Sequence, residues 1–222
     1  MAIDTDEQTR APLSRERVLR AAIEVADDAG FESLSMRKIG QHLGVEAMSL
    51  YNHVSNKDDL LQGVVDMLLD EVELVTDQGD WRETMRAQAL AARAVLVQHP
   101  WARRVLEVLP DMTPGLIAYF DRIMGIMRTN GFSVDLAHHA LHLLGSRVLG
   151  FDTDLFDDGG DEVDADALAA MQQQMAGQFP YVAEMISVVS HDGPLGGCDD
   201  EFEFTFGLDL ILEGLHARRD EI

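Results

Sequence analysis

The sequence is poor in several residue types, and each shortage excludes a class of protein. Among its 222 residues there is one cysteine, Cys198, so neither an intrachain disulfide nor a zinc site built from several thiolates can form. No apolar run approaches the roughly 20 residues of a membrane-spanning helix. The polar, acidic first nine residues contain no apolar segment like that of a secretory signal. We therefore expect a protein without a membrane partner, most simply a cytoplasmic one.

Positive charge is also scarce, since 17 lysine and arginine residues stand against 40 acidic residues and give a net charge of −23. Nucleic acid binding needs clustered basic residues, so the average charge argues against it. The shortage is uneven, however: residues 10–57 carry a net charge of +1, whereas residues 58–222 carry −21. This asymmetry indicates two parts with different partners. Hydrophobic residues make up 46% of the chain, enough for a folded core.

Capping residues and glycines predict three short helices in the first part. Ser14 is placed to cap the first helix, and Gly30 to end it. Ser35 is placed to cap the second, which ends at Gly44, and Gly40 sits where a small residue lets the second and third helices approach closely. The third is expected over about residues 46–53. Two short helices joined around a glycine form a helix-turn-helix, whose second helix enters the major groove of DNA.

The outward residues of the third helix suit DNA contacts. The amide of Asn52 can read a base edge, and Met48 can contact a thymine methyl group. The hydroxyls of Ser49 and Tyr51 can donate to phosphates. The helical pattern alone leaves a second interpretation open, in which Tyr51 and His53 pack the small domain.

Residues 34–61 contain three dense motifs, R-K-I-x-x-x-L-G-V, L-Y-x-H-V and N-K-x-x-L-L. With the helix before them, over about residues 14–61, they resemble the DNA-binding signature of the tetracycline-repressor (TetR) family. The resemblance implies an all-α homodimer with an N-terminal DNA-binding head and a C-terminal body that binds a ligand and dimerises. The implied units are a disordered tail at 1–13, the helix-turn-helix domain at 14–57 and the ligand-binding and dimerisation domain at 58–222.

Carried over by position, the resemblance makes Arg37 and residues 47–52 candidate base readers, and several neighbours candidate phosphate contacts. The complete set of DNA-binding candidates is Arg37, Ala47, Met48, Ser49, Tyr51, Asn52, His53 and Lys57. Ala47 and Met48 make no polar contact with bases, so DNA shape is expected to contribute to specificity.

Amphipathic periods beyond residue 57 predict a helical bundle. Helices are expected over about 56–75, 80–99, 101–109, 113–130, 133–151, 165–177, 180–189 and 200–218. Asn56 with Asp59 approximates a capping box at the first of these. The last segment alternates like a strand, but no second strand-like run exists to pair with it, and its motif F-x-x-G-L-D-L-I-L-E-G-L resembles the final helix of the family's body.

The segment 152–166 holds eight acidic residues and no basic one, and we expect a mobile surface loop there. Its acid spacing does not fit the EF-hand calcium loop. Pro194 to Gly197 predicts a turn. Cys198 is a weak candidate for a redox sensor, because it lacks basic neighbours.

The two long late helices, 133–151 and 200–218, are the expected dimer interface, and the resemblance implies that these helices from two subunits form a four-helix bundle. The candidates for this interface are Leu144, Arg147, Phe206, Leu210 and Leu215. A ligand pocket is expected among the helices between residues 60 and 151. Its candidates are Met67, Met85, Leu106, Met112, Leu116, Phe120, Met124 and His142. The eleven methionines of the chain suit an adaptable apolar cavity, although a methionine or phenylalanine at helical spacing is more often plain core.

We predict a DNA-binding transcriptional regulator, a repressor, that a small-molecule effector releases from an inverted-repeat operator. No cofactor and no catalytic residue are predicted. The alternative is a metal-dependent hydrolase or metal sensor that uses His138 and His142, which share a helix face at i, i+4; a metal site needs a third ligand, and none is identifiable. A third possibility keeps the fold but has a partner protein as effector.

Overall fold

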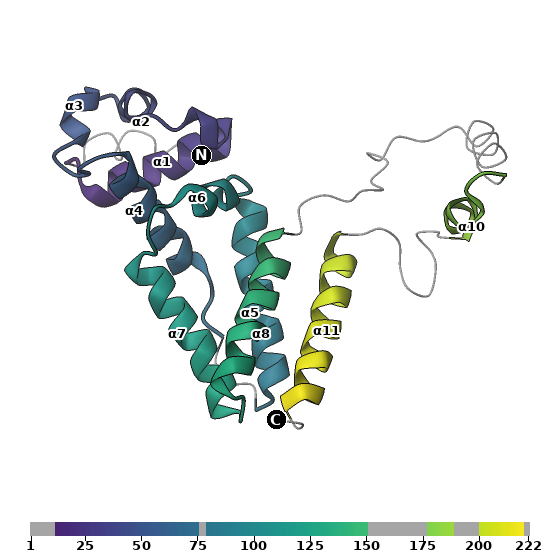
Figure 1. Ribbon diagram of the computed structural model, residues 1–222. Coiled ribbons are helices and arrows are strands. Elements are labelled where there is room, and N and C mark those ends of the chain that lie inside the picture. The colour runs from purple at the N-terminus through teal and green to yellow at the C-terminus, as the bar shows by residue number, and fades with distance from the viewer. Residues whose placement is uncertain (1–11, 76–78, 151–176, 189–199, 220–222) are drawn as a thin grey trace, which may run out of the picture.

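The computed structural model describes residues 12–75, 79–150, 177–188 and 200–219, and every regular element in these ranges is helical. The all-α prediction is therefore confirmed. Figure 1 shows a head at one end and a body of long helices below it, with α4 leading from one to the other. The elements are α1 (Arg15–Ala29), η2 (Phe31–Ser33), α2 (Met36–Leu43), α3 (Ala47–Leu50), α4 (Lys57–Glu71), α5 (Trp81–Gln98), α6 (Ala102–Val108), α7 (Pro114–Thr129), α8 (Val134–Gly150), α10 (Pro180–Val188) and α11 (Asp200–Arg219).

The predicted caps define the first two helices. The Ser14 side chain accepts a hydrogen bond from the backbone N–H of Arg17, and the Ser35 side chain accepts one from Lys38. Gly44 ends α2 in the left-handed conformation, with a φ of 68°, which costs glycine little. The predicted starts of α1 and α2 and the predicted end of α2 are therefore confirmed.

Two elements are shorter than the sequence predicts. The chain after α3 turns through i to i+3 hydrogen bonds, from Asn52 N–H to Ser49 and from His53 N–H to Leu50, so α3 ends before residue 53. The helix expected to reach residue 75 ends at Glu71, because Val72 is extended. Beyond it, the backbone at Val75 bonds to a side chain of α5 instead of continuing the helix.

In the body, α5, α6, α7 and α8 match the predicted segments within a few residues, and α10 matches the segment 180–189. The ambiguous last segment is the helix α11, which confirms the choice of helix over strand. The predicted loop at 152–166, the helix at 165–177 except its last residue, the turn at 194–197 and Cys198 lie outside the described residues. No described helix is long and apolar enough to cross a membrane.

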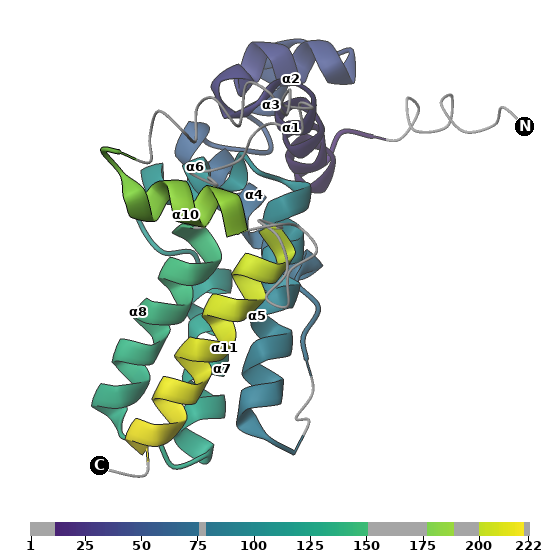
Figure 2. The same ribbon diagram turned by 90° about the vertical axis from the view of Figure 1, so that its right-hand side faces the viewer.

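The buried residues form two cores. The first joins α1 to α4 with the end of α5 and with α6, so the head packs onto the upper body. The second lies between α5, α7, α8 and α11, where the rings of Trp81 and Phe132 meet edge to face at 4.7 Å. Figure 2 shows α8 and α11 side by side along the body, and α11 ends away from the head. The head is thus attached through α4 and α6.

Candidate DNA-binding surface and ligand cavity

The helix-turn-helix is held together at Gly40. A Cβ atom added there would lie 2.9 Å from the carbonyl oxygen of Val45 and 3.2 Å from the Cα atom of Ala47, too close for any side chain. Ile39 and Leu50 are fully buried beneath the two helices. Residues of the core therefore fix the direction of α3 relative to α2, as the sequence predicted from the small residue at position 40.

The eight DNA-binding candidates lie at the start of α2, on α3 and the turn after it, and at the start of α4, all at the head end of the molecule (Figure 1). Met48 is 75% exposed and Tyr51 is 45% exposed. Arg37, Asn52 and Lys57 are also exposed, whereas Ala47, Ser49 and His53 are half-buried. The exposure of Tyr51 argues against the interpretation that this ring packs the head.

Two of these candidates have partners that the sequence did not indicate. The hydroxyl of Ser49 donates to the carbonyl oxygen of Glu46 at 2.6 Å, so it accepts from a new partner more readily than it donates to a phosphate. The Lys57 ammonium lies 5.4 Å from the centroid of the Phe31 ring, a cation–π distance. This contact orients Lys57 at the first turn of α4.

Arg15 joins three segments of the head. Its guanidinium donates to the backbone oxygen of His53 at 3.0 Å and to the carboxylate of Asp59 at 2.6 Å. Asp59 also accepts from the N–H of Ser55, and these hydrogen bonds hold its pKa below the usual value. The Asn56 side chain accepts from the N–H of Asp59 at 2.8 Å, which confirms the predicted cap. Sequence reasoning found the cap and missed Arg15.

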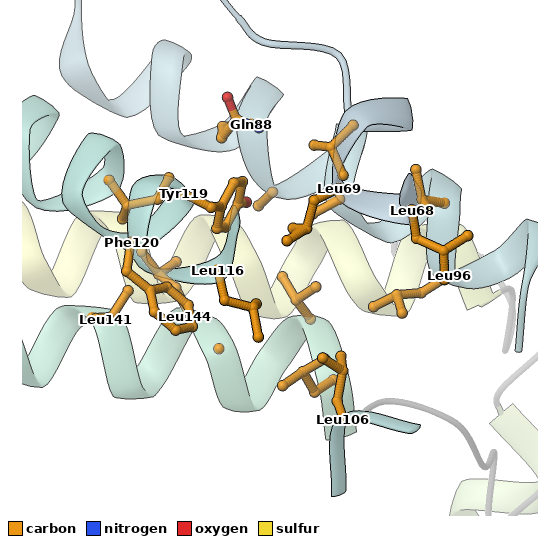
Figure 3. A pocket seen from close by; sticks show the side chains of 18 of the residues that line it. Leu68, Leu69, Gln88, Leu96, Leu106, Leu116, Tyr119, Phe120, Leu141 and Leu144 are labelled. Carbon is orange, nitrogen blue, oxygen red and sulfur yellow. The ribbon is translucent and has the colours of Figure 1, made fainter. Parts of the chain in front are cut away.

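An apolar cavity of about 330 Å³ lies inside the body between α4, α5, α6, α7 and α8 (Figure 3). Five of the eight ligand candidates line it, namely Met85, Leu106, Met112, Leu116 and Phe120. The other three do not: Met67 packs against the first core, Met124 packs against the second, and His142 is exposed on α8. The volume falls within the range of small-molecule sites.

Gln88 and Tyr119 are the polar side chains of this cavity wall, and sequence reasoning missed both. Gln88 is fully buried; its oxygen accepts from the N–H of Val75 at 3.3 Å, and its amide donates to the carbonyl of Glu73 at 3.5 Å. Burial raises the pKa of the Tyr119 phenol, and a hydrogen bond with Gln88 opposes that rise. Gln88 is a polar residue beside the apolar stripe of α5, and this position in the sequence could have indicated it.

The five dimer candidates occupy three kinds of position. Leu144 and Leu215 are buried in the protomer's own second core, and Leu144 also lines the cavity. Phe206 and Leu210, in contrast, are 46% and 54% exposed on α11, and Leu143 and Leu149 are exposed on α8, the helix that packs against α11. Arg147 donates to the backbone oxygens of Glu203 and Phe204, and thereby ties α8 to α11.

The histidines of α8 are exposed, with ring centroids of His138 and His142 4.6 Å apart and those of His138 and His139 5.5 Å apart. Within the described residues, no group of three or more His, Cys, Asp or Glu side chains could hold a metal ion. No observation favours the metal-dependent hydrolase.

A helix-turn-helix head, joined by one helix to a larger helical body with an apolar cavity, defines a DNA-binding protein of the ligand-responsive kind. Residues 18–64 match the family model of bacterial regulatory proteins of the tetR family, and residues 75–219 match that of the tetracyclin repressor-like C-terminal domain. The chain belongs to the TetR family of transcriptional regulators, whose repressors bind DNA and are released by a ligand.

Individual relatives agree with this assignment. The transcriptional repressor DrrR1 of Streptomyces coeruleorubidus is 30% identical over 92% of this chain and 78% of its own. The class C tetracycline repressor of Escherichia coli is 28% identical over 93% and 92%. ActR of Streptomyces coelicolor in complex with actinorhodin has a TM-score of 0.75 and 29% identity, over 94% of this chain and 99% of its own.

Proposed function

We propose that this chain is a cytoplasmic homodimeric repressor whose heads leave an inverted-repeat operator when a neutral, mostly apolar molecule fills the body cavity. Residues 14–57 form the DNA-binding unit and residues 58–222 the ligand-binding and dimerisation unit. One observation carries the proposal: α4 begins at the candidate DNA surface with Lys57 and contributes Val65, Leu68 and Leu69 to the cavity wall. Filling the cavity therefore acts on a helix that also reaches DNA.

In this proposal, Arg37, Met48, Tyr51 and Asn52 meet the major groove, because they are exposed around a recognition helix whose position is fixed from beneath. Lys57 contacts a phosphate. Exposed Phe206 and Leu210 on α11, with exposed Leu143 and Leu149 on α8, supply the apolar part of the dimer interface. Two-fold symmetry then places two recognition helices in successive major grooves, roughly 34–36 Å apart.

Selection of bound genomic fragments by the whole protein identifies the operator and tests the DNA-binding part. With that operator, Arg37→Ala and Tyr51→Ala are expected to abolish the gel shift while the dimer stays folded by circular dichroism and sedimentation. Arg82→Ala, at the far end of α5, removes the same charge from the body and serves as the control. Operator binding near the wild-type level by both head variants would overturn the assignment of this surface.

The cavity indicates the chemistry of the ligand. Among the described residues no charged side chain lines it, and an unpaired charge is costly in an apolar enclosure, so the enclosed part of the ligand is uncharged. Gln88 and Tyr119 offer one polar edge with both donors and acceptors. The related ActR, solved with actinorhodin bound, supports an organic ligand for this body.

Leu116→Trp tests the cavity, because the larger ring occupies space that the ligand needs. N-phenyl-1-naphthylamine, a neutral dye that fluoresces in apolar surroundings, is the probe. The wild type is expected to bind it and Leu116→Trp to lose binding. The control is Ile117→Trp, since Ile117 is exposed and does not line the cavity. Equal dye binding by both variants would show that the dye lies elsewhere.

A further inference from the structure

A charged cluster outside the cavity and the DNA surface surrounds His99, which is only 3% exposed. One ring nitrogen, Nδ1, lies 2.6 Å from a carboxylate oxygen of Asp27, and the other, Nε2, lies 3.2 Å from one of Glu71. The indole N–H of Trp101 donates to the same Asp27 oxygen at 2.7 Å. The rings of His99 and Trp101 meet edge to face, with centroids 5.9 Å apart.

These four residues come from three parts of the molecule. Asp27 lies in the last turn of α1 in the head, Glu71 is the last residue of α4, and His99 and Trp101 form the corner between α5 and α6 in the body. Carboxylate oxygens accept hydrogen bonds, and both ring nitrogens of His99 and the indole N–H of Trp101 lie within hydrogen-bond distance of them. The corner of the body thereby holds two acidic residues, one from the head and one from the connecting helix, at one point.

The same corner belongs to the cavity wall. The N–H of His99 donates to the carbonyl of Val95 at 2.8 Å, and the N–H of Ala102 donates to the carbonyl of His99 at 2.9 Å. Val95 and Ala102 both line the cavity. A molecule that separates α5 from α6 therefore moves His99 through two backbone hydrogen bonds, and Trp101 lies in the same corner. The partners that these two side chains hold lie on α1 and on α4.

We propose that Asp27, Glu71, His99 and Trp101 are positioning residues that transmit the filling of the cavity to the orientation of the head. This inference rests on the proposed function, because it assumes that cavity and operator are coupled. Coupling between two sites is reciprocal, so bound operator weakens binding in the cavity by the factor by which the ligand weakens binding of the operator. The ratio of the two ligand dissociation constants, with and without operator, therefore measures the coupling between cavity and head, which the stability of the fold does not.

The test compares Asp27→Ala with Asp28→Ala in the whole protein. Asp28 is the next residue on α1 and is exposed like Asp27, so both variants remove one charge from the same turn. The dissociation constant of N-phenyl-1-naphthylamine is measured with and without operator. We expect the wild type and Asp28→Ala to bind the dye about 5-fold or more weakly with operator present, as coupled sites do, and Asp27→Ala to lose most of that ratio. Glu71→Ala against Asp70→Ala repeats the comparison at α4.

Trp101 provides a second readout that does not use the dye. In a Trp81→Phe chain, Trp101 is the remaining tryptophan, and its emission is expected to shift when operator binds. With Asp27→Ala added, the shift is expected to disappear while the operator still binds. If these residues had only a structural role, Asp27→Ala would lower the melting temperature and keep both the coupling ratio and the emission shift. That result would overturn this inference and leave the proposed function untouched. Absence of coupling in the wild type would overturn it together with the proposed ligand release.

Discussion

The head and the body are both helical, but their chemistry resides in different places. In the head, the candidate residues stand outside a tightly packed core: Tyr51 and Met48 are exposed, and the approach of α2 to α3 leaves no space for a Cβ atom at Gly40. In the body, the candidate site is the space of about 330 Å³ that the packing leaves open. A larger side chain in the head therefore displaces a helix of the DNA-binding surface, whereas a larger side chain in the cavity wall occupies the space of the ligand.

The largest effect is expected from Gly40→Ala. The new methyl group meets backbone atoms of Val45 and Ala47, which cannot rotate away, and overpacking of this kind costs about 1–3 kcal/mol. Displacement of α3 should abolish operator binding in a fluorescence anisotropy titration. Dye binding in the cavity should persist, because no atom of the cavity wall lies in this contact.

The matched variant in the body is Gly125→Ala, in the exposed middle of α7, where an added Cβ atom meets nothing within 4 Å. This variant should leave operator binding intact and stabilise the fold by about 0.5–1 kcal/mol in thermal unfolding. Full operator binding by Gly40→Ala would remove the claimed difference between the head and the body.

Asp59→Asn is expected to have the next largest effect, on acid stability. The bonds from Arg15 and Ser55 lower the folded-state pKa of Asp59. Its contribution is therefore complete above the unfolded-state pKa of about 3.9 and is lost as pH falls through the lower folded-state value. The variant should lose about 1–2 kcal/mol of stability near pH 7 and show a smaller further loss between pH 5 and pH 2 (roughly the range of the linkage).

Urea unfolding at several pH values measures this effect. Asp58→Asn, one residue away and exposed at the same helix start, is the control, and it should retain the acid dependence of the wild type. If the free energy of unfolding of Asp59→Asn fell with pH as steeply as that of the wild type, the Arg15–Asp59 contact would add nothing to the attachment of α1 to α4.

The predictability of the two regions from sequence differs for a physical reason. Helix starts depend on local hydrogen bonds, so Ser14, Ser35 and Asn56 were identified as caps from neighbouring residues alone. Gly40 was identified because a helix-turn-helix needs close approach. The early end of α4 was missed, because the backbone beyond it bonds to Gln88 thirteen residues further along the chain from Val75.

The cavity was predicted in part for the same reason. Apolar periodicity identified Met85, Leu116 and Phe120 as inward residues, but it cannot separate a residue that faces a space from one that packs a core, as Met124 does. The His99 cluster joins residues as far as 74 positions apart, and no local pattern indicates which acidic residues meet a histidine across the fold.

The smallest expected effect concerns Lys57. It compares the loss of a positive charge in the head with the loss of one in the body. If Lys57 neutralises one phosphate in each half-site, Lys57→Ala should reduce the slope of log affinity against log salt by about 0.9 per half-site, and weaken binding similarly for all operator sequences. Arg82→Ala removes a positive charge from the acidic body and should leave the slope unchanged, because the body stays away from the duplex. Anisotropy titrations over a salt series measure both slopes. A reduction by Arg82→Ala equal to that by Lys57→Ala would mean that the overall charge of the protein, rather than a phosphate contact in the head, sets the salt dependence.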